Sequence, residues 1–161
     1  MMAGVLLLVS GCTVQYTMSG ASISPEVETV SVAYFTNQAS IVKPSLSQNL
    51  TDALKDKIQQ NTRLTLVTEG GDVSFEGEIS QYDSEPISIG ANERAAENRL
   101  TMVLRVKYTN NVEPDLSFDK RFSRHEDYES SQTLSQVEDE LNELILDQLV
   151  QDIFEEAFVN W

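Results

Sequence analysis

Three stretches of the chain alternate between hydrophobic and polar residues, the pattern of strands that bury one face. The clearest begins at Val73, the longest runs from Leu100 to Tyr108, and a third runs from Leu116 to Phe122 with Lys120 interrupting its apolar side. That interruption indicates a bulge or an edge strand. Shorter β-rich runs at 30–35 and 64–67 predict two further strands.

Two segments instead repeat their hydrophobic residues at helical spacing. The first carries Leu46, Leu50, Leu54 and Ile58 and opens on Ser45 and Gln48, which match a capping box. The second opens on Ser135 and Glu138, again a capping-box pattern. Its predicted buried stripe is Val137, Leu141, Leu144, Ile145, Leu149, Ile153, Phe154 and Ala157.

Turn-forming residues separate these elements. A turn is expected at 69–72, where glycine tolerates positive φ, and another at 110–115 around Pro114. A polar loop is expected around Pro86, Gly90 and Asn92. The order strand, helix, strands, helix predicts an α+β fold, a two-layer sandwich with two helices on one face of a mixed, mainly antiparallel sheet of four to five strands.

The N-terminus carries a short apolar run that ends at Cys12, the single cysteine of the chain. The tetrapeptide at 9–12 resembles the bacterial lipobox, in which the cysteine is acylated after cleavage. The run is too short to cross a membrane but suits a signal sequence, although no basic residue precedes it. We therefore expect a signal peptide at 1–11, a lipidated Cys12 with a tether at 12–28, and one domain at 29–161. The alternative is a buried cysteine near the N-terminus.

Charge is abundant and uneven. The chain has 26 acidic and 11 basic residues, a net charge of −15, and no basic residue follows Arg124. This balance argues against nucleic acid as the main ligand. Seven basic residues nevertheless fall between Arg94 and Arg124.

Part of this basic segment forms a candidate anion-binding patch. A hairpin at 110–115 would place Tyr108 opposite Phe118 and Arg105 opposite Arg121. Like charges directly across a strand pair are destabilising, so an anionic ligand between them would account for the arrangement. The alternative is that acids such as Glu78 and Asp119 neutralise the cations. The patch consists of Arg99, Arg105, Lys107, Arg121 and Arg124.

Catalytic and metal-binding patterns are missing from the sequence. His125 is the single histidine, so metal-ligand spacing with cysteine is absent. No nucleophile elbow, phosphate-binding loop or dinucleotide motif occurs. We expect no cofactor, no metal and no enzymatic activity.

An ordered set of short segments resembles the LptE family of lipopolysaccharide-assembly lipoproteins, in the form found in Bacteroidota. The resemblance runs from the lipobox to Trp161. The segments are residues 32–37, 62–64, 71–72, 75–79, 98–101, 122–123 and 152–154.

The resemblance implies an outer-membrane lipoprotein on the periplasmic side, with two helices packed on one sheet. Such proteins plug the lumen of the LptD barrel, assist its assembly and bind lipopolysaccharide. We therefore expect three partners: an LptD-type barrel, lipopolysaccharide, and the membrane through the N-terminal lipid. A weaker resemblance to curli-secretion lipoproteins leaves a periplasmic secretion-channel component as the alternative.

Overall fold

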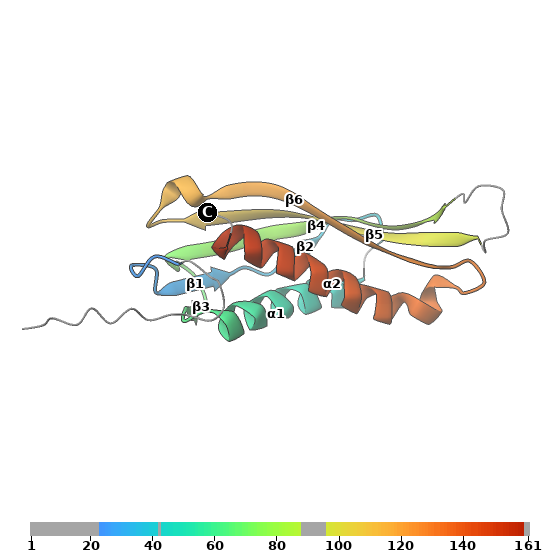
Figure 1. The fold of residues 1–161 in the computed structure, drawn as a ribbon, viewed down its shortest axis with the longest axis horizontal. Coiled ribbons are helices and arrows are strands. Elements are labelled where there is room, and N and C mark those ends of the chain that lie inside the picture. The colour runs from blue at the N-terminus through green and yellow to red at the C-terminus, as the bar shows by residue number, and fades with distance from the viewer. Residues whose placement is uncertain (1–22, 42, 88–95, 160–161) are drawn as a thin grey trace, which may run out of the picture.

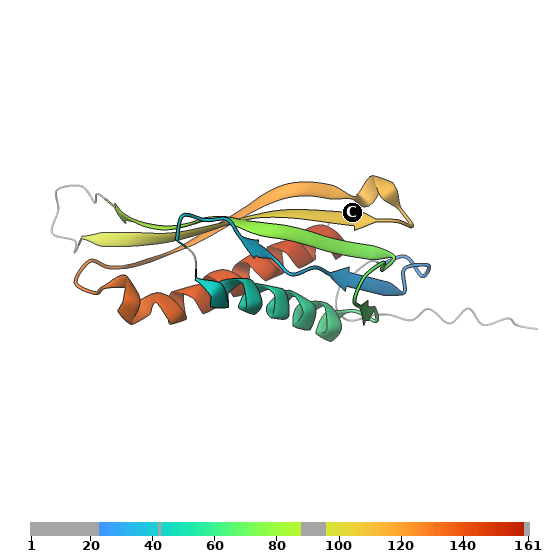
Figure 2. The same cartoon turned by 180° about the vertical axis from the view of Figure 1, so that it is seen from behind.

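A computed structural model describes residues 23–41, 43–87 and 96–159, arranged as two layers. One layer is a twisted sheet, and the other consists of two helices that both cover the same face of it (Figures 1 and 2). The predicted signal peptide, Cys12, Gly90, Asn92 and Trp161 lie outside the described residues.

The sheet has six strands in the order β3-β1-β4-β5-β6, and β2 pairs with β4 in line with β1. Pairings among β1, β2, β3 and β4 are parallel, whereas β4–β5 and β5–β6 are antiparallel. The predicted fold class is therefore confirmed, with the very short β2 added to a path of five. The strands are β1 (Thr29–Val32), β2 (Thr36–Asn37), β3 (Thr65–Val67), β4 (Val73–Ile87), β5 (Glu97–Asn110) and β6 (Phe118–Glu129).

The alternating residues of β4 and β5 face the helices as predicted. Val73, Phe75, Ile79 and the five alternate residues from Leu100 to Tyr108 are all at most 1 % exposed. A hairpin joins β5 to β6, with the short 3₁₀ helix η1 (Pro114–Leu116) in the turn. Leu116 thus precedes β6, and β6 is an edge strand, as the interruption at Lys120 indicated.

β4 is longer than the sequence predicted and contains a one-residue bulge. Ile79 pairs with Leu104 and Gln81 with Val103, which leaves Ser80 as the extra residue. The bulge shifts the alternation of the strand by one residue, so that Tyr82 faces the helices as Ile79 does and is fully buried. The loop predicted at Pro86 was wrong, because Pro86 continues β4 and pairs with Asn98 of β5. No described strand pairs with the other side of β4 at this point, so a proline is tolerated there.

Both helices form, but each begins before the predicted capping box. Helix α1 (Pro44–Asn61) has Lys43 as its N-cap and Pro44 in its first turn, so Ser45 does not cap it. Helix α2 (Leu134–Phe158) is capped by Thr133, whose backbone N–H donates to the Gln136 side chain at 2.8 Å. The observed N-caps, Lys43 and Thr133, each lie two residues before the predicted ones, Ser45 and Ser135.

The core lies between the helices and the sheet. Leu46, Leu50, Leu54 and Ile58 of α1 are fully buried, as predicted. The prediction for Leu144 was wrong, because this side chain is 45 % exposed on the outer side of α2. The last turn of α2 packs Phe158 edge-on against Phe75 and Tyr108, with ring centroids 5.8 and 6.0 Å apart.

The predicted strand at 30–35 is divided, because Phe35 turns into the core. Its backbone N–H donates to Thr51 Oγ1 on α1 at 3.1 Å, and its ring lies against Gly77 of β4. A Cβ on Gly77 would lie 2.5 Å from the Phe35 ring and 2.5 Å from the Arg105 carbonyl oxygen. Glycine is therefore required at this position.

We predict that Gly77→Ala lowers the free energy of unfolding by about 1–3 kcal/mol, the usual cost of overpacking. The matched variant Ser74→Ala lies on the opposite face of the same strand and should change it by under about 0.5 kcal/mol. Urea unfolding followed by circular dichroism measures both. Equal stability of the two variants would contradict the Phe35–Gly77 contact.

Asp72 connects the turn before β4 to the start of β1 through hydrogen bonds. Its Oδ2 accepts hydrogen bonds from the Glu28 N–H at 3.0 Å, the Thr29 N–H at 2.9 Å and the Thr29 hydroxyl at 2.8 Å. These bonds, led by that from Glu28, lower the pKa of the Asp72 carboxyl. The preceding turn uses Gly70 at φ 71°, as the sequence predicted.

We predict that Asp72→Asn destabilises the protein near neutral pH and that the deficit shrinks on acidification. A carboxyl whose pKa is lowered by folding stabilises the folded state above its unfolded pKa, and this stabilisation is lost as the pH falls through the folded pKa. Urea unfolding between about pH 7 and pH 3 measures the difference from wild type. The exposed Asp56→Asn provides the control, and a pH-independent deficit would contradict the carboxylate's role.

Candidate functional site on the open face of the sheet

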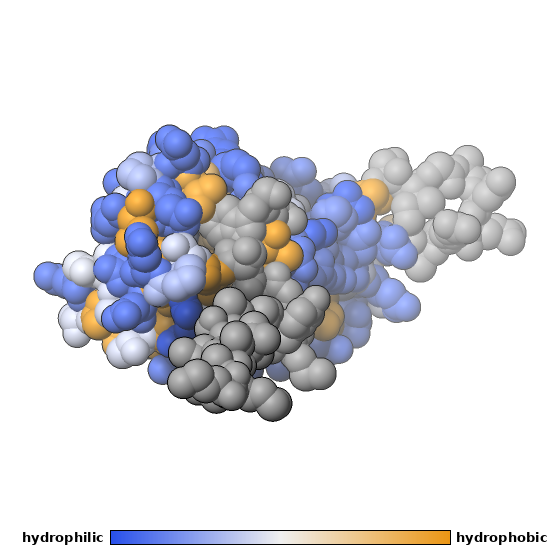
Figure 3. Space-filling view, turned by 60° about the vertical axis from the view of Figure 1, so that its left-hand side comes forward, coloured by the Kyte–Doolittle hydropathy of each residue, from blue (hydrophilic) through white to orange (hydrophobic). Residues whose placement is uncertain are grey.

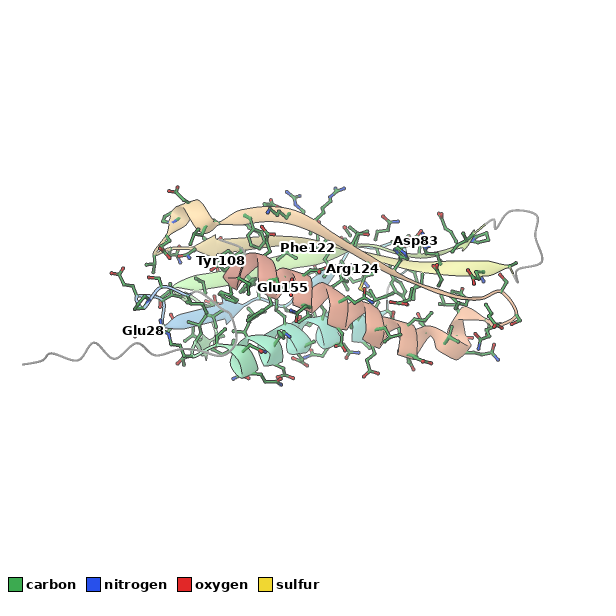
Figure 4. All side chains as sticks on the ribbon, viewed as in Figure 1. Glu28, Asp83, Tyr108, Phe122, Arg124 and Glu155 are labelled. Carbon is green, nitrogen blue, oxygen red and sulfur yellow. The ribbon has the colours of Figure 1, made fainter. Side chains whose placement is uncertain are left out.

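The face of β4, β5 and β6 that the helices leave uncovered carries most of the predicted basic patch. The β5–β6 register places Arg105 opposite Arg121 and Tyr108 opposite Phe118, as predicted. Arg99 and Lys107 lie on this same open face, because they alternate with the buried residues of β5. Asp83 points outward on the same side in Figure 4.

Three of these cations form ion pairs with carboxylates. Arg105 donates from Nε and Nη2 to the two carboxylate oxygens of Asp119, at 3.0 and 2.8 Å. Arg99 engages Asp127 in the same two-pronged way, at 2.7 and 2.9 Å. Lys107 Nζ lies 3.6 Å from Glu76.

These pairs change the ionisation of both partners. The hydrogen bonds from Arg105 and Arg99 lower the pKa values of Asp119 and Asp127, and the pKa values of the two arginines rise. Both sides of each pair therefore stay charged over a wide pH range. The cations are held as ion pairs rather than left free.

Arg121 differs from its neighbours. It is exposed and makes no ion pair with any carboxylate of residues 23–41, 43–87 and 96–159. It stands directly opposite Arg105, whose guanidinium reaches diagonally to Asp119. Among the cations of the open face, Arg121 is therefore the one that an anionic ligand could bind without displacing a described carboxylate.

Arg124 lies on the other face of the sheet. Its guanidinium donates to both carboxylate oxygens of Asp152 on α2, each at 2.6 Å, and Figure 4 shows it between β6 and α2. Two further polar contacts join the same strand to the same helix, Lys120 with Glu156 and Gln148 with Glu126. Gln148, Asp152 and Glu156 follow at four-residue spacing, so one row of α2 holds the edge strand.

The open face is acidic in sum and only shallowly hollowed. A depression of about 340 Å³ lies over β4 and β5 and is lined by Arg105 and Lys107 together with Glu76, Glu78 and Asp119. Carboxylates of the whole face outnumber its four cations. They include Glu76, Glu78, Asp83, Glu85, Asp119 and Asp127.

Sequence reasoning missed a polar cluster inside the molecule. The Tyr82 hydroxyl donates to Glu138 Oε1 at 2.7 Å and contacts the Asn142 side chain at 3.0 Å, while Lys43 Nζ lies 2.9 Å from Glu138 Oε2. Burial opposes ionisation of Glu138, but the bonds from Tyr82 and Lys43 lower its pKa. The sequence signal for this cluster was two residues with polar groups, Tyr82 and Asn142, at positions that lie in the core.

Metal-ligating clusters of three or more residues do not occur in the described part of the chain. No described helix has the length and apolar character of a membrane span.

The hydrophilic character extends to the end of the molecule that carries β1 and β3. Figure 3 shows mostly hydrophilic residues there, with hydrophobic residues in small groups. Tyr34 is the most exposed of the large hydrophobic side chains in the described part, at 55 %.

The two-layer arrangement is shared with solved bacterial proteins, two of which are lipoproteins. A minor lipoprotein from Acinetobacter baumannii matches with a TM-score of 0.52 and 16 % identity over 81 % of this chain and 94 % of that one. Lipoprotein B from Nitrosomonas europaea matches with a TM-score of 0.51 and 18 % identity over 89 % and 88 %. Hypothetical protein CT253 from Chlamydia trachomatis matches with a TM-score of 0.54 and 7 % identity over 83 % and 99 %. At these identities the likeness establishes the fold.

A family profile gives the assignment. The profile of LptE, described as lipopolysaccharide-assembly, matches residues 27–157. The chain belongs to the LptE family, as its sequence resemblance predicted, and acts in lipopolysaccharide assembly. No curated protein sequence matches it significantly.

We predict that the two arginines near the middle of β6 differ in their effect on stability. Arg124→Gln should lower the free energy of unfolding by up to about 1 kcal/mol, because it removes the ion pair with Asp152. Arg121→Gln should leave it within about 0.5 kcal/mol of wild type. Thermal unfolding at low and high salt measures both, and the Arg124 deficit should shrink at high salt. Equal effects would contradict the placement of these side chains on opposite faces.

Proposed function

We propose that this protein is an outer-membrane lipoprotein that plugs an LptD-type barrel and helps to assemble it, so that lipopolysaccharide reaches the cell surface. The family match over residues 27–157 carries the proposal. Anchoring would come from acylation of Cys12, the residue that ends the lipobox-like segment. Its role would be to bind and assemble rather than to catalyse.

The size and form of the domain support a plug. The described residues form one elongated two-layer body with a single hydrophobic core (Figure 1). One broad side of the sheet is free of helices and covered with charged residues, which suits contact with a hydrated barrel lumen.

We further propose that cations of the open face contact lipopolysaccharide phosphates. Arg121 is exposed and unpaired among the described carboxylates, and Arg105 stands opposite it. A phosphate bound at Arg121 would also accept hydrogen bonds from Arg105 if Arg105 released its bonds to Asp119. Arg99 and Lys107 would contribute less, because carboxylates already hold them, and Arg124 faces α2.

Affinity purification of the tagged full chain from native membranes tests the plug. We expect a large lipopolysaccharide-transport barrel to co-purify in stoichiometric amount. A Cys12→Ala variant should keep its fold but leave the membrane fraction, which tests the anchor separately. Isolation of rings of this chain alone, or of no barrel, would contradict the plug and favour a secretion-channel component or another role.

The anion patch is tested by lipopolysaccharide binding to charge variants. Arg121→Glu combined with Arg105→Glu should weaken binding by roughly tenfold or more, because two charge-assisted hydrogen bonds are lost. Arg124→Gln should leave the affinity unchanged and provides the control. Unchanged binding by the double variant would remove the patch while leaving the plug intact.

A further inference from the structure

A second hollow, of about 320 Å³, lies on the open face of the sheet, at the end of the molecule that carries β1 and β3 (Figure 1). The strand register places Ser31 of β1 opposite Ser74 of β4, and both residues line the hollow. Ser74 lies in turn opposite Thr109 of β5. Hydroxyl groups therefore form one level of the open face, next to the charged level that begins at Glu76.

The turn before β4 forms the rim of this hollow. Glu69, Gly70 and Gly71 line it, and the Asn111 side chain donates to the Gly71 carbonyl oxygen at 3.1 Å. A Cβ on Gly71 would lie 2.7 Å from the backbone nitrogen of Ser31, so the rim lies directly against β1. The shape of the hollow is thus fixed by backbone contacts.

Ser31 supplies a buried polar group to the hollow. The residue is only 6 % exposed, and its hydroxyl makes no hydrogen bond with the part of the chain that the structure describes. Buried hydroxyl groups normally have a hydrogen-bond partner, because burial without one costs free energy. A hydroxyl group of a ligand in the hollow would supply this bond.

The lining groups indicate the kind of ligand. Ser31, Ser74 and Asn111 can both donate and accept hydrogen bonds, whereas Glu69 and Glu76 accept them. The two carboxylates disfavour an anion here but form strong hydrogen bonds with hydroxyl groups. We propose that the hollow binds a sugar ring, with ring hydroxyls bonded to the two serines and to the carboxylates beside them.

The hollow adjoins the cations of the open face. It shares Glu76 with the depression over β4 and β5, and Lys107 lies opposite Glu76. From Ser74 to Arg121 the chain covers four residues along β4 and two strands across, about 13 Å and about 10 Å, or about 16 Å in all. A ligand that contacts both is therefore an oligosaccharide with a phosphate distant from the bound ring. This extension rests on the proposed anion patch, whereas the sugar site itself does not.

Amide NMR of the full chain in non-ionic detergent tests the sugar site. The probe is the oligosaccharide of lipopolysaccharide from the cells that make the protein, freed of its acyl chains and phosphates. We expect saturable shifts of the Ser31, Gly71 and Ser74 amide signals. A titration that leaves these three signals unmoved would overturn the sugar site, whatever the phosphorylated form does at Arg121.

A pair of serine variants measures the contribution of the hydroxyls. Ser31→Ala combined with Ser74→Ala should weaken binding of this probe about tenfold, because two hydrogen bonds to the ring are lost. Ser123→Ala combined with Ser130→Ala removes two exposed hydroxyls outside the hollow and should bind as wild type does. Circular dichroism checks that both variants fold. Equal affinities of the two variants would count against the proposal.

The phosphorylated oligosaccharide separates this site from the anion patch. The variant with both Ser31 and Ser74 changed should lose affinity for both forms, whereas Arg121→Glu combined with Arg105→Glu should lose it for the phosphorylated form alone. If the arginine variant also fails to bind the dephosphorylated form, the sugar lies over the charged depression and the hollow is not its site. Arginine substitutions that affect neither form would remove the anion patch and leave the sugar site in place.

Discussion

The packing of α2 across β4, β5 and β6 is the contact on which the rest of the structure depends. Apolar residues of α2 cover the alternate residues of β4 and β5, and its last turn completes an aromatic cluster around Phe158. At the edge of the sheet, polar side chains of the same helix bind β6 through ion pairs and a hydrogen bond. Because strand residues alternate between faces, this packing also decides which side chains remain on the open face.

Much of this fold could be predicted from periodicity. Period-two alternation identified β4 and β5, four-residue spacing identified both helices, and one turn gave the hairpin that sets Arg105 opposite Arg121. Helix starts were misplaced by one or two residues, because several residues near each start can cap it. The exposure of Leu144 could not be predicted, since it depends on how far the packed layer extends around α2.

The candidate site was predicted less completely than the fold. Strand register places residues on a face, but it does not say which carboxylate a long arginine side chain will reach. Arg105 bypasses its direct neighbours and binds Asp119 diagonally, so repulsion from Arg121 is relieved within the sheet. The ion pair of Arg124 could not be predicted without the position of α2, since its partner Asp152 is distant in the sequence.

The bulge at Ser80 sets a rule for how the length of β4 can change. Removing Ser80 would leave an unbroken ladder in which Gln81 follows Ile79 directly, so that Tyr82 would still face the helices and Asp83 would stay on the open face. Removing one residue from the regularly paired part between Val73 and Ile79 would instead turn the residues on one side of the deletion to the opposite face. In related proteins, a single deletion at the bulge should therefore keep the tyrosine cluster with α2, whereas a single deletion elsewhere in the strand should disturb the core.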